Sequence, residues 1–380
     1  MKKVLVPSVR FKGFSEEWKE EKFGELLFRI NEKGYEFLET LTASKSGEML
    51  KRKSINYHIQ VAKESLKNYN RVLKNDFVLH LSTYESGLAY SKEIGITSPA
   101  YDVLRFFDKN NNDPIFFKYV FSNKKFINSL VPFTYGLRQG KSINLVELNK
   151  SLIEKTNISE QQKIGKLLDH ISNLIILEQL KLNKLKQLKQ TLLQKMFPEA
   201  NSKVPRIRFR GFEGEWEEER ISNILTYVQP WKYLTKKKNF DMLGDIPVLT
   251  ANKSLLLGYS VEDNYYNKEC IIFDDFTQDF KHINYPFLLK SSAIKILIPN
   301  NNYSISFIFF LFQSLRFESQ GHARHYISYV QKKIIRLPST NEANKIIKLL
   351  DNITNLLDLY NSKLNKLKQI KEALLQKMFV

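Results

Sequence analysis

The chain of 380 residues uses one plan twice, and this internal repeat constrains its fold more than any other feature. Residues 6–14, followed by Trp18, recur at identical spacing as residues 204–212, followed by Trp216. Residues 181–197 recur as residues 363–379, with 14 of 17 positions the same. Because a long internal repeat marks a structural unit that is used more than once, we expect two related units.

The two copies share their borders and differ between them. The first pair of segments is offset by 198 residues and the second by 182, so the stretch between them differs in length by 16 residues. Residues 33–155 show no visible alignment with residues 232–338. We therefore predict four regions: a variable domain with its N-terminal shared segment over 1–158, a long helix over 159–199, a second variable domain with the repeated shared segment over 200–338, and a second long helix over 339–380.

The second shared segment lies in a long amphipathic helix. Apolar residues recur at intervals of three and four positions over residues 159–196 and again, in the same register, over about residues 340–378. Ser159, with Gln162 three positions later, predicts an N-cap with a capping box, and Pro198 follows the other end. Each helix would be roughly 55 Å long at 1.5 Å per residue.

Two equal apolar stripes in one chain are expected to pack on each other as an antiparallel coiled coil. The second helix stops where the chain would otherwise re-enter at Val6, so joining the ends would complete a ring with pseudo-twofold symmetry. The residues predicted to pack between the helices or against a partner are Ile164, Leu167, Ile171, Leu174, Leu185, Leu188, Leu192, Ile346, Leu349, Ile353, Leu356, Leu367, Ile370 and Leu374.

The interiors of the two halves mix short strand-like runs with helix-like stretches. The strand-like runs are residues 76–81, 100–107, 270–273 and 293–298, and the helix-like stretches are residues 115–130 and 304–317. The predicted fold class is therefore α/β (α+β) and multidomain: two globular variable domains separated by two long antiparallel coiled-coil helices, in a pseudo-twofold arrangement.

The charge of the chain favours a polyanionic partner. The formal net charge is +19, from 59 Lys and Arg against 40 Asp and Glu, and basic side chains gain affinity by releasing counterions from phosphates. Basic, aromatic and amide side chains cluster within both variable domains, which suits phosphate contacts and readout of base edges. The candidate DNA-binding residues are Lys51, Arg52, Lys53, Tyr57, Arg138, Gln139, Lys141, Lys236, Lys237, Lys238, His322, Arg324 and His325, the last three as an exposed group.

Catalytic motifs are incomplete. Residues 136–142 are one residue short of a phosphate-binding loop, and residues 113–116 lack the second proline of the methyltransferase tetrapeptide. Asp274, Asp275 and Asp279 have no partner motif of a nuclease, and the six histidines lack metal-ligand spacing. We predict a chain without a catalytic or metal site.

The redox and membrane features of the sequence point to the cytoplasm. The single cysteine, Cys270, allows no intrachain disulfide and is expected to be a small buried side chain. No apolar run reaches the roughly 18 residues that a membrane-spanning helix needs. We therefore expect a soluble cytoplasmic protein.

The shared segments resemble those of the specificity subunits of type I restriction-modification enzymes, over essentially the whole chain. The resemblance is carried by residues 6–18 and their copy at 204–216, by Ser-Glu-Gln-Gln-Lys-Ile at 159–164, and by Leu-Leu-Gln-Lys-Met-Phe at 192–197 and 374–379. The second helix departs from the pattern at residues 340–345, which weakens its expected cap.

This resemblance implies a role and a set of partners. Each variable domain would be a target-recognition domain that reads one half of a split, asymmetric site in double-stranded DNA, and the paired helices would fix the gap between the halves. Two methyltransferase subunits would dock on the shared regions, and two ATP-dependent restriction subunits would join them. S-adenosylmethionine, ATP and magnesium would be bound by those partners and no cofactor by this chain.

Two other functions stay open at this point. The chain would be a stand-alone DNA-binding or scaffold protein if the helices mediate self-association. It would be an NTP-dependent enzyme if the loop at Gly136 binds phosphate. Co-purification of a methyltransferase separates the first of these from the specificity subunit, and nucleotide hydrolysis by the isolated chain tests the second.

Overall fold

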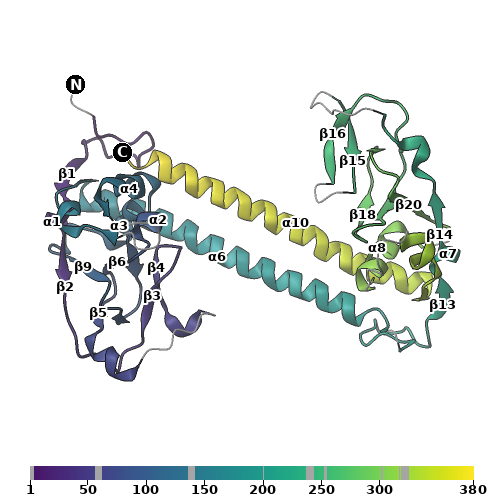
Figure 1. Cartoon of the computed structure of the whole chain (residues 1–380), viewed down its shortest axis with the longest axis horizontal. Coiled ribbons are helices and arrows are strands. Elements are labelled where there is room, and N and C mark those ends of the chain that lie inside the picture. Colours follow the sequence, from purple (N-terminus) through teal and green to yellow (C-terminus); the bar gives the residue numbers. More distant parts are fainter. Residues whose placement is uncertain are drawn as a thin grey trace. The chain divides into compact units, whose positions relative to one another are not determined.

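The computed structural model describes residues 4–55, 62–135, 142–199, 201–236, 244–251, 255–300, 303–315, 317 and 325–380. The chain divides into two compact units (Figure 1). Unit 1 comprises Met1–Gln179 and Ser362–Val380, and unit 2 comprises Leu180–Asn361. Two long helices, α6 (Ile158–Lys195) and α10 (Thr340–Lys377), each contribute residues to both units.

Unit 1 is built on a six-stranded sheet with the strand order β2-β9-β6-β7-β4-β3, supplemented by the pairs β1-β12, β5-β8 and β10-β11. In chain order its elements are β1 (Lys19–Lys22), α1 (Phe23–Leu26), β2 (Leu27–Ile30), β3 (Leu41–Ala43), β4 (Glu48–Lys51), η1 (Arg52–Ser54), η2 (Lys63–Asn68), β5 (Asn70–Val72), β6 (Phe77–Leu79), α2 (Thr83–Ser86), β7 (Ala89–Ser91), β8 (Gly95–Thr97), β9 (Asp102–Phe106), α3 (Pro114–Phe121), α4 (Lys124–Ser129), η3 (Val131–Phe133), β10 (Thr134–Tyr135), β11 (Ser142–Ile143), α5 (Leu145–Leu148) and β12 (Leu152–Lys155).

Unit 2 has a four-stranded sheet with the order β14-β20-β17-β18, a three-stranded sheet with the order β16-β15-β19, and the pair β13-β21. Its elements are β13 (Glu217–Arg220), α7 (Ile221–Ile224), β14 (Leu225–Val228), η5 (Pro230–Tyr233), β15 (Ile246–Leu249), β16 (Leu256–Ser260), β17 (Cys270–Asp274), β18 (Phe280–Ile283), β19 (Leu288–Leu289), β20 (Ile294–Pro299), α8 (Ile305–Ser314), α9 (His325–Ser328), η6 (Val330–Lys332) and β21 (Ile334–Leu337). The predicted fold class, mixed α and β with two long helices, is confirmed.

The interiors of the two units share a sheet core, although their sequences show no visible alignment. The strand order β2-β9-β6 in unit 1 matches β14-β20-β17 in unit 2, and both sets are antiparallel. The registers also correspond, because Leu27 pairs with Phe106 as Leu225, 198 residues later, pairs with Pro299. A helix follows the central strand in each unit, α3 and α8 respectively. The variable domains are therefore two elaborations of one core.

The shared border segments form the same contacts in both units. Phe379 lies edge-on to Trp18 and stacks on Phe116 in unit 1. Phe197 lies edge-on to Trp216, with ring centroids 6.0 Å apart, in unit 2. The C-terminal end of a long helix therefore packs against the shared tryptophan in each unit, that of α10 in unit 1 and that of α6 in unit 2.

The long helices run antiparallel within each unit. In unit 1, Glu178 of α6 binds Lys363 of α10 at 2.9 Å. The same core holds Ile164 from the start of α6 and Met378 from just beyond the end of α10. In unit 2, the start of α10 and the end of α6 share one core in the same way. Lys189 Nζ there donates to Thr354 Oγ1 at 2.8 Å.

The predicted packing stripe divides into buried, partly buried and exposed residues. Ile164, Ile171, Ile346 and Ile353 are buried, and Leu167, Leu174, Leu185, Leu192, Leu349, Leu367 and Leu374 are partly buried. Leu188, Leu356 and Ile370 are exposed, so they do not pack between the helices in the chain by itself. A stripe of intervals three and four is wider than a helix seam, and its margin reaches solvent.

The predicted cap of the first helix is wrong by two residues. Helix α6 begins at Ile158, and the side chain of Asn157, not Ser159, accepts a hydrogen bond from Glu160 N at 3.0 Å. Ser339, 182 residues later, accepts from Glu342 N at 3.4 Å and so caps α10. The cap is thus present in both copies. In the described part of the chain no helix is long and apolar enough to cross a membrane.

Candidate nucleic-acid interface

Five of the thirteen candidate DNA-binding residues lie in the described part of the chain: Lys51, Arg52, Lys53, Lys236 and His325. The other eight lie outside the described residues: Tyr57, Arg138, Gln139, Lys141, Lys237, Lys238, His322 and Arg324. The structure brings the first three together at the end of β4 and the start of η1 in unit 1.

The cations at the end of β4 are tied to neighbours by weak surface contacts. Lys53 Nζ lies 2.7 Å from Glu39, and both side chains are largely exposed. Lys51 Nζ lies 3.6 Å from Glu93. The guanidinium of Arg52 lies 5.9 Å from the ring centre of Tyr69. Exposed ion pairs contribute little free energy, so these cations can exchange a carboxylate for a phosphate at little cost.

A second group of cations and aromatics surrounds β5. The Arg71 guanidinium lies 4.4 Å from the ring centre of Tyr35, and its Nη1 lies 3.5 Å from Glu32. Arg105 bridges Glu32 at 3.1 Å and donates two hydrogen bonds to the buried carboxylate of Asp76 at 2.7 and 2.8 Å. This chain of charges fixes β5 and the segment that carries Tyr35, a residue that no sequence pattern singles out.

His325 is a correction to the predicted exposed group. Its side chain is buried, and Nδ1 lies 2.6 Å from the backbone oxygen of Asp275. The carboxylate of Asp275 accepts from Tyr326 N at 2.9 Å and binds the buried Lys295 at 3.0 Å. A ring enclosed in this way cannot reach a base edge, so His325 anchors the start of α9 instead.

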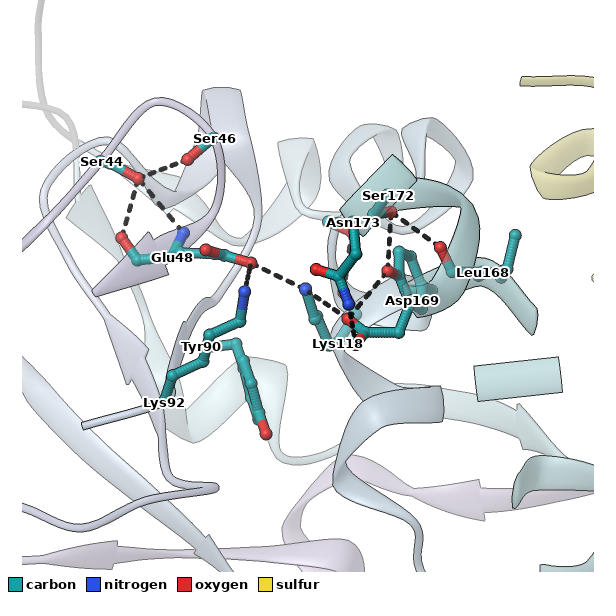
Figure 2. A network of polar contacts seen from close by, with 12 residues as sticks. Ser44, Ser46, Glu48, Tyr90, Lys92, Lys118, Leu168, Asp169, Ser172 and Asn173 are labelled. Atoms are coloured by element: carbon teal, nitrogen blue, oxygen red, sulfur yellow. Dashed lines mark hydrogen bonds and ion pairs between the residues drawn. The ribbon is translucent and has the colours of Figure 1, made fainter. Parts of the chain in front are cut away.

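Unit 1 also contains a polar network between its variable domain and the helix pair (Figure 2). Lys118 of α3 lies almost fully buried in the apolar run Pro114–Phe121, and its Nζ lies 2.7 Å from Glu48 and 3.2 Å from Asp169 of α6. Lys92 binds the same Glu48 at 2.9 Å. Burial alone would raise the pKa of the Glu48 carboxyl, but its bonds to the two lysines outweigh burial and leave that pKa lowered.

The matching place in unit 2 uses different chemistry. Counted from the residues that cap α3 and α8, Lys118 corresponds to Phe309. The helix side of the contact is retained, because Lys371 lies 5.5 Å from the ring centre of Tyr119 and Lys189, its repeat partner, lies 5.3 Å from that of Phe310. Each variable domain therefore docks on an equivalent part of the helix pair with its own side chains. A lysine within an apolar helical run was the only sequence signal for this network.

The acidic residues of β17 have structural partners. Asp274 accepts hydrogen bonds from Phe276 N and Thr277 Oγ1, which fixes the turn before β18. Across the described ranges, no group of three or more metal-ligating side chains gathers. Burial raises the pKa of the Cys270 thiol to about 12, which leaves it protonated and unreactive at neutral pH.

Comparison with known proteins finds a family match in the second half of the chain. Residues 213–369 match the family described as "Type I restriction modification DNA specificity domain". The matched residues include the β14-β20-β17-β18 sheet, α8 and most of α10.

Two known proteins are similar to the chain. The specificity subunit of the type I restriction enzyme EcoR124I/EcoR124II from Escherichia coli is 33% identical over 160 residues. That match covers 40% of this chain and 39% of the relative, so it spans about two fifths of the relative's length. The crystal structure of the type I restriction-modification S subunit from M. genitalium is 17% identical, with a TM-score of 0.63 over 99% of both chains. The similarity to the S-subunit fold therefore extends beyond residues 213–369, to unit 1 as well.

Proposed function

We propose that this chain is the DNA-specificity subunit of a type I restriction-modification enzyme, in which each variable domain reads one half of a split, asymmetric DNA site. One observation carries the proposal: two variable domains with the same sheet core but different sequences are each bordered by the same shared segments and long helices. One of these domains lies within residues 213–369, which match the DNA specificity domain family. Two different DNA-binding domains held by equivalent shared segments suit a DNA site with two different halves.

The same proposal gives the helices a partner. Leu177 and Leu359 are equivalent residues of the repeat, and their side chains are 52% and 64% exposed. Leu188 and Ile370 form a second such pair of exposed apolar side chains. Apolar residues displayed at equal positions suit two copies of one partner protein. We assign this surface to two methyltransferase subunits, with restriction subunits joining the assembly.

The chain in this proposal supplies recognition and no chemistry. The methyltransferase subunits would bind S-adenosylmethionine and methylate adenine, and restriction subunits would use ATP and magnesium. Asp274 stabilises a turn, Asp275 forms an ion pair with Lys295, and Cys270 lies in the core. A cytoplasmic location follows from this role, because its DNA target lies there.

Mapping of methylated adenines tests the proposal directly. The methyltransferase gene is expressed with and without this chain, and the genome is sequenced for methylated bases. We expect one bipartite motif that appears only with the chain, and co-purification of the chain with the methyltransferase. A chain that purifies alone as a homodimer, with no change in methylation, would support a stand-alone DNA-binding or scaffold protein instead.

A further inference from the structure

An exposed tryptophan stands on a firmly held segment of unit 2, directly after the edge strand β14. Trp231 in η5 is 65% exposed, although tryptophan normally covers its large apolar surface. The backbone around it is fixed, because Asn264 Nδ2 donates to the carbonyls of Lys232 and Leu234 at 3.1 and 3.2 Å. Thr235 N donates to Leu289 O at 2.9 Å. The indole of Trp231 is therefore exposed to solvent, while the backbone that carries it is held in place by hydrogen bonds.

The side chains beside Trp231 divide into one that faces the core and two that carry charge. Tyr233 packs edge-on against the buried Tyr266, with ring centroids 5.1 Å apart. Lys232 and Lys236 are exposed, and residues 229–236 include no acidic residue. An aromatic anchor flanked by exposed cations suits a ligand that has both apolar rings and negative charge, and nucleic acid is such a ligand.

Unit 1 has a comparable display after its own edge strand β2. Tyr35, which corresponds to Tyr233 in the repeat, lies under the Arg71 guanidinium, and Phe37 beyond it is 78% exposed. Gly34 N donates to Lys67 O at 3.2 Å, so this backbone is also held. Lys33 and Lys67 are exposed beside it, and residues 31–38, the equivalent of 229–236, include two acidic residues, Glu32 and Glu36.

We propose that Trp231 and Phe37 are the aromatic anchors that contact DNA bases, Trp231 in the half-site of unit 2 and Phe37 in the half-site of unit 1. The flanking lysines contact the phosphates. This inference rests on the proposed function and names the residues that carry it out. An aromatic side chain discriminates between base pairs by apolar contact, such as with the thymine methyl group, or by entering a deformable base step.

A protein partner fits these positions less well. The surfaces that serve two copies of one partner should be alike, as Leu177 and Leu359 are. The aromatic anchors differ instead: Trp231 corresponds to Lys33 in the repeat, and Phe37 corresponds to Thr235. Their type and their place vary between units, as residues that read two different half-sites must.

The test uses the complete complex with its methyltransferase subunits and short duplexes that carry the motif found by methylation mapping. Three duplexes are compared: the full motif, and the motif with either half scrambled. We expect Trp231→Ala to weaken binding of the full motif about tenfold or more. Scrambling the half-site of unit 2 should then cost little further affinity, while scrambling the other half keeps its full effect. Phe37→Ala should show the reverse pattern.

The control is Phe276→Ala, which removes another largely exposed phenylalanine of unit 2, on the turn after β17. We expect it to bind all three duplexes as the wild type does. Trp231→Ala with unaltered discrimination at both half-sites would overturn the inference and leave the proposed function standing. Loss of methyltransferase co-purification with unchanged discrimination would also overturn it, since Trp231 would then contact protein. A wild-type complex that does not distinguish the three duplexes would overturn the proposed function itself.

Discussion

The guanidinium of Arg208 faces the carboxylate of Glu342 through two parallel hydrogen bonds of 2.7 and 2.8 Å. Arg10 and Glu160 repeat this geometry in unit 1, at 2.6 and 2.8 Å. Both glutamates are almost fully buried, one turn into a long helix, and both arginines belong to the first shared segment. The first shared segment is thus joined in space to the start of a long helix by one ion pair per unit.

Removing one member of this pair should destabilise unit 2 strongly. Arg208→Met leaves the buried carboxylate of Glu342 without its partner, and such a loss costs about 3 kcal/mol or more. We expect a large drop in the urea midpoint, which the fluorescence of Trp216, buried in unit 2, can follow. The double variant Arg208→Met with Glu342→Leu should recover much of the loss, because no buried charge remains. A single variant as stable as the wild type would contradict the role of the pair.

The shared segments and the long helices could be predicted from sequence because their residues are repeated in identity and in spacing. The ring-like order of the segments was predicted from the same repeat. The shared sheet core could not, because Phe77 and Ile271 hold equivalent places and only their apolar character is retained. The helix cap was misplaced because Ser159 and Asn157 are both good caps, and only the backbone decides between them.

The site residues were harder to predict than the fold, since exposure is a property of tertiary structure. His325 lies among basic residues in sequence, yet its ring points into unit 2 toward Asp275. Trp231 precedes the basic residues 236–238 in sequence, but its exposure depends on the contacts that hold its neighbours. The ion pair of Lys118 with Asp169 could not be predicted from sequence, because it depends on how α3 packs against α6.

Unit 1 should lose stability in acid through His80. Burial lowers the pKa of this histidine to about 4, and its Nδ1 accepts a hydrogen bond from Ser82 N, which requires the neutral ring. Above pH 6.5 the contribution is complete, because the ring is neutral in the folded and unfolded states. As the pH falls from about 6.5 to 4 the unfolded chain takes up the proton first, so up to about 3 kcal/mol is lost.

The measurement is urea unfolding of the wild type and His80→Gln at pH 7, 5.5 and 4. We expect the variant to be less stable at pH 7 and to lose less stability between pH 7 and pH 4. His170→Gln, which removes an exposed histidine of α6, is the matched control and should keep the wild-type pH dependence. Equal pH dependence in the wild type and His80→Gln would show that His80 titrates normally.

Charges on the exposed apolar residues of the helices should prevent assembly without changing sequence choice. Leu177→Asp and Leu359→Asp place a charge where a methyltransferase subunit is proposed to dock, and each should remove one subunit from the purified complex. Leu185→Asp should also abolish assembly, but Leu185 is partly buried and its substitution will lower stability too. Gln187→Asp, at an exposed polar position of α6, controls for the added charge. Gel filtration that shows intact complexes with both leucine variants would rule out this docking surface.

Lengthening both helices together should lengthen the recognised gap. Four residues added after Lys186 extend α6 by about 6 Å, or one to two base pairs. Alone, they would misalign the contacts of Lys181 with Tyr360 and of Lys189 with Thr354. A matched insertion after Asn355 in α10 should restore this register. Methylation mapping then reports the gap: an unchanged gap with the double insertion would disprove the spacer role of the helices.

The junction in unit 1 between the end of α10 and the first shared segment should accept a covalent link. Val9 N donates to Lys377 O at 2.9 Å, just as Ile207 N donates to Lys195 O at 2.8 Å where the chain is continuous. Residues 198–203 make that connection with six residues, and Val380 joined to residues 1–5 would also supply six.

A permutant that fuses Val380 to Met1 and opens the chain between Ala200 and Asn201 should therefore fold, bind methyltransferase and direct methylation to the same motif. Opening the chain between Ile272 and Phe273, inside β17 at the centre of the unit 2 sheet, is the matched control and should prevent folding. A soluble permutant that directs methylation to another motif would show that the two junctions are not equivalent, although their hydrogen bonds and lengths are.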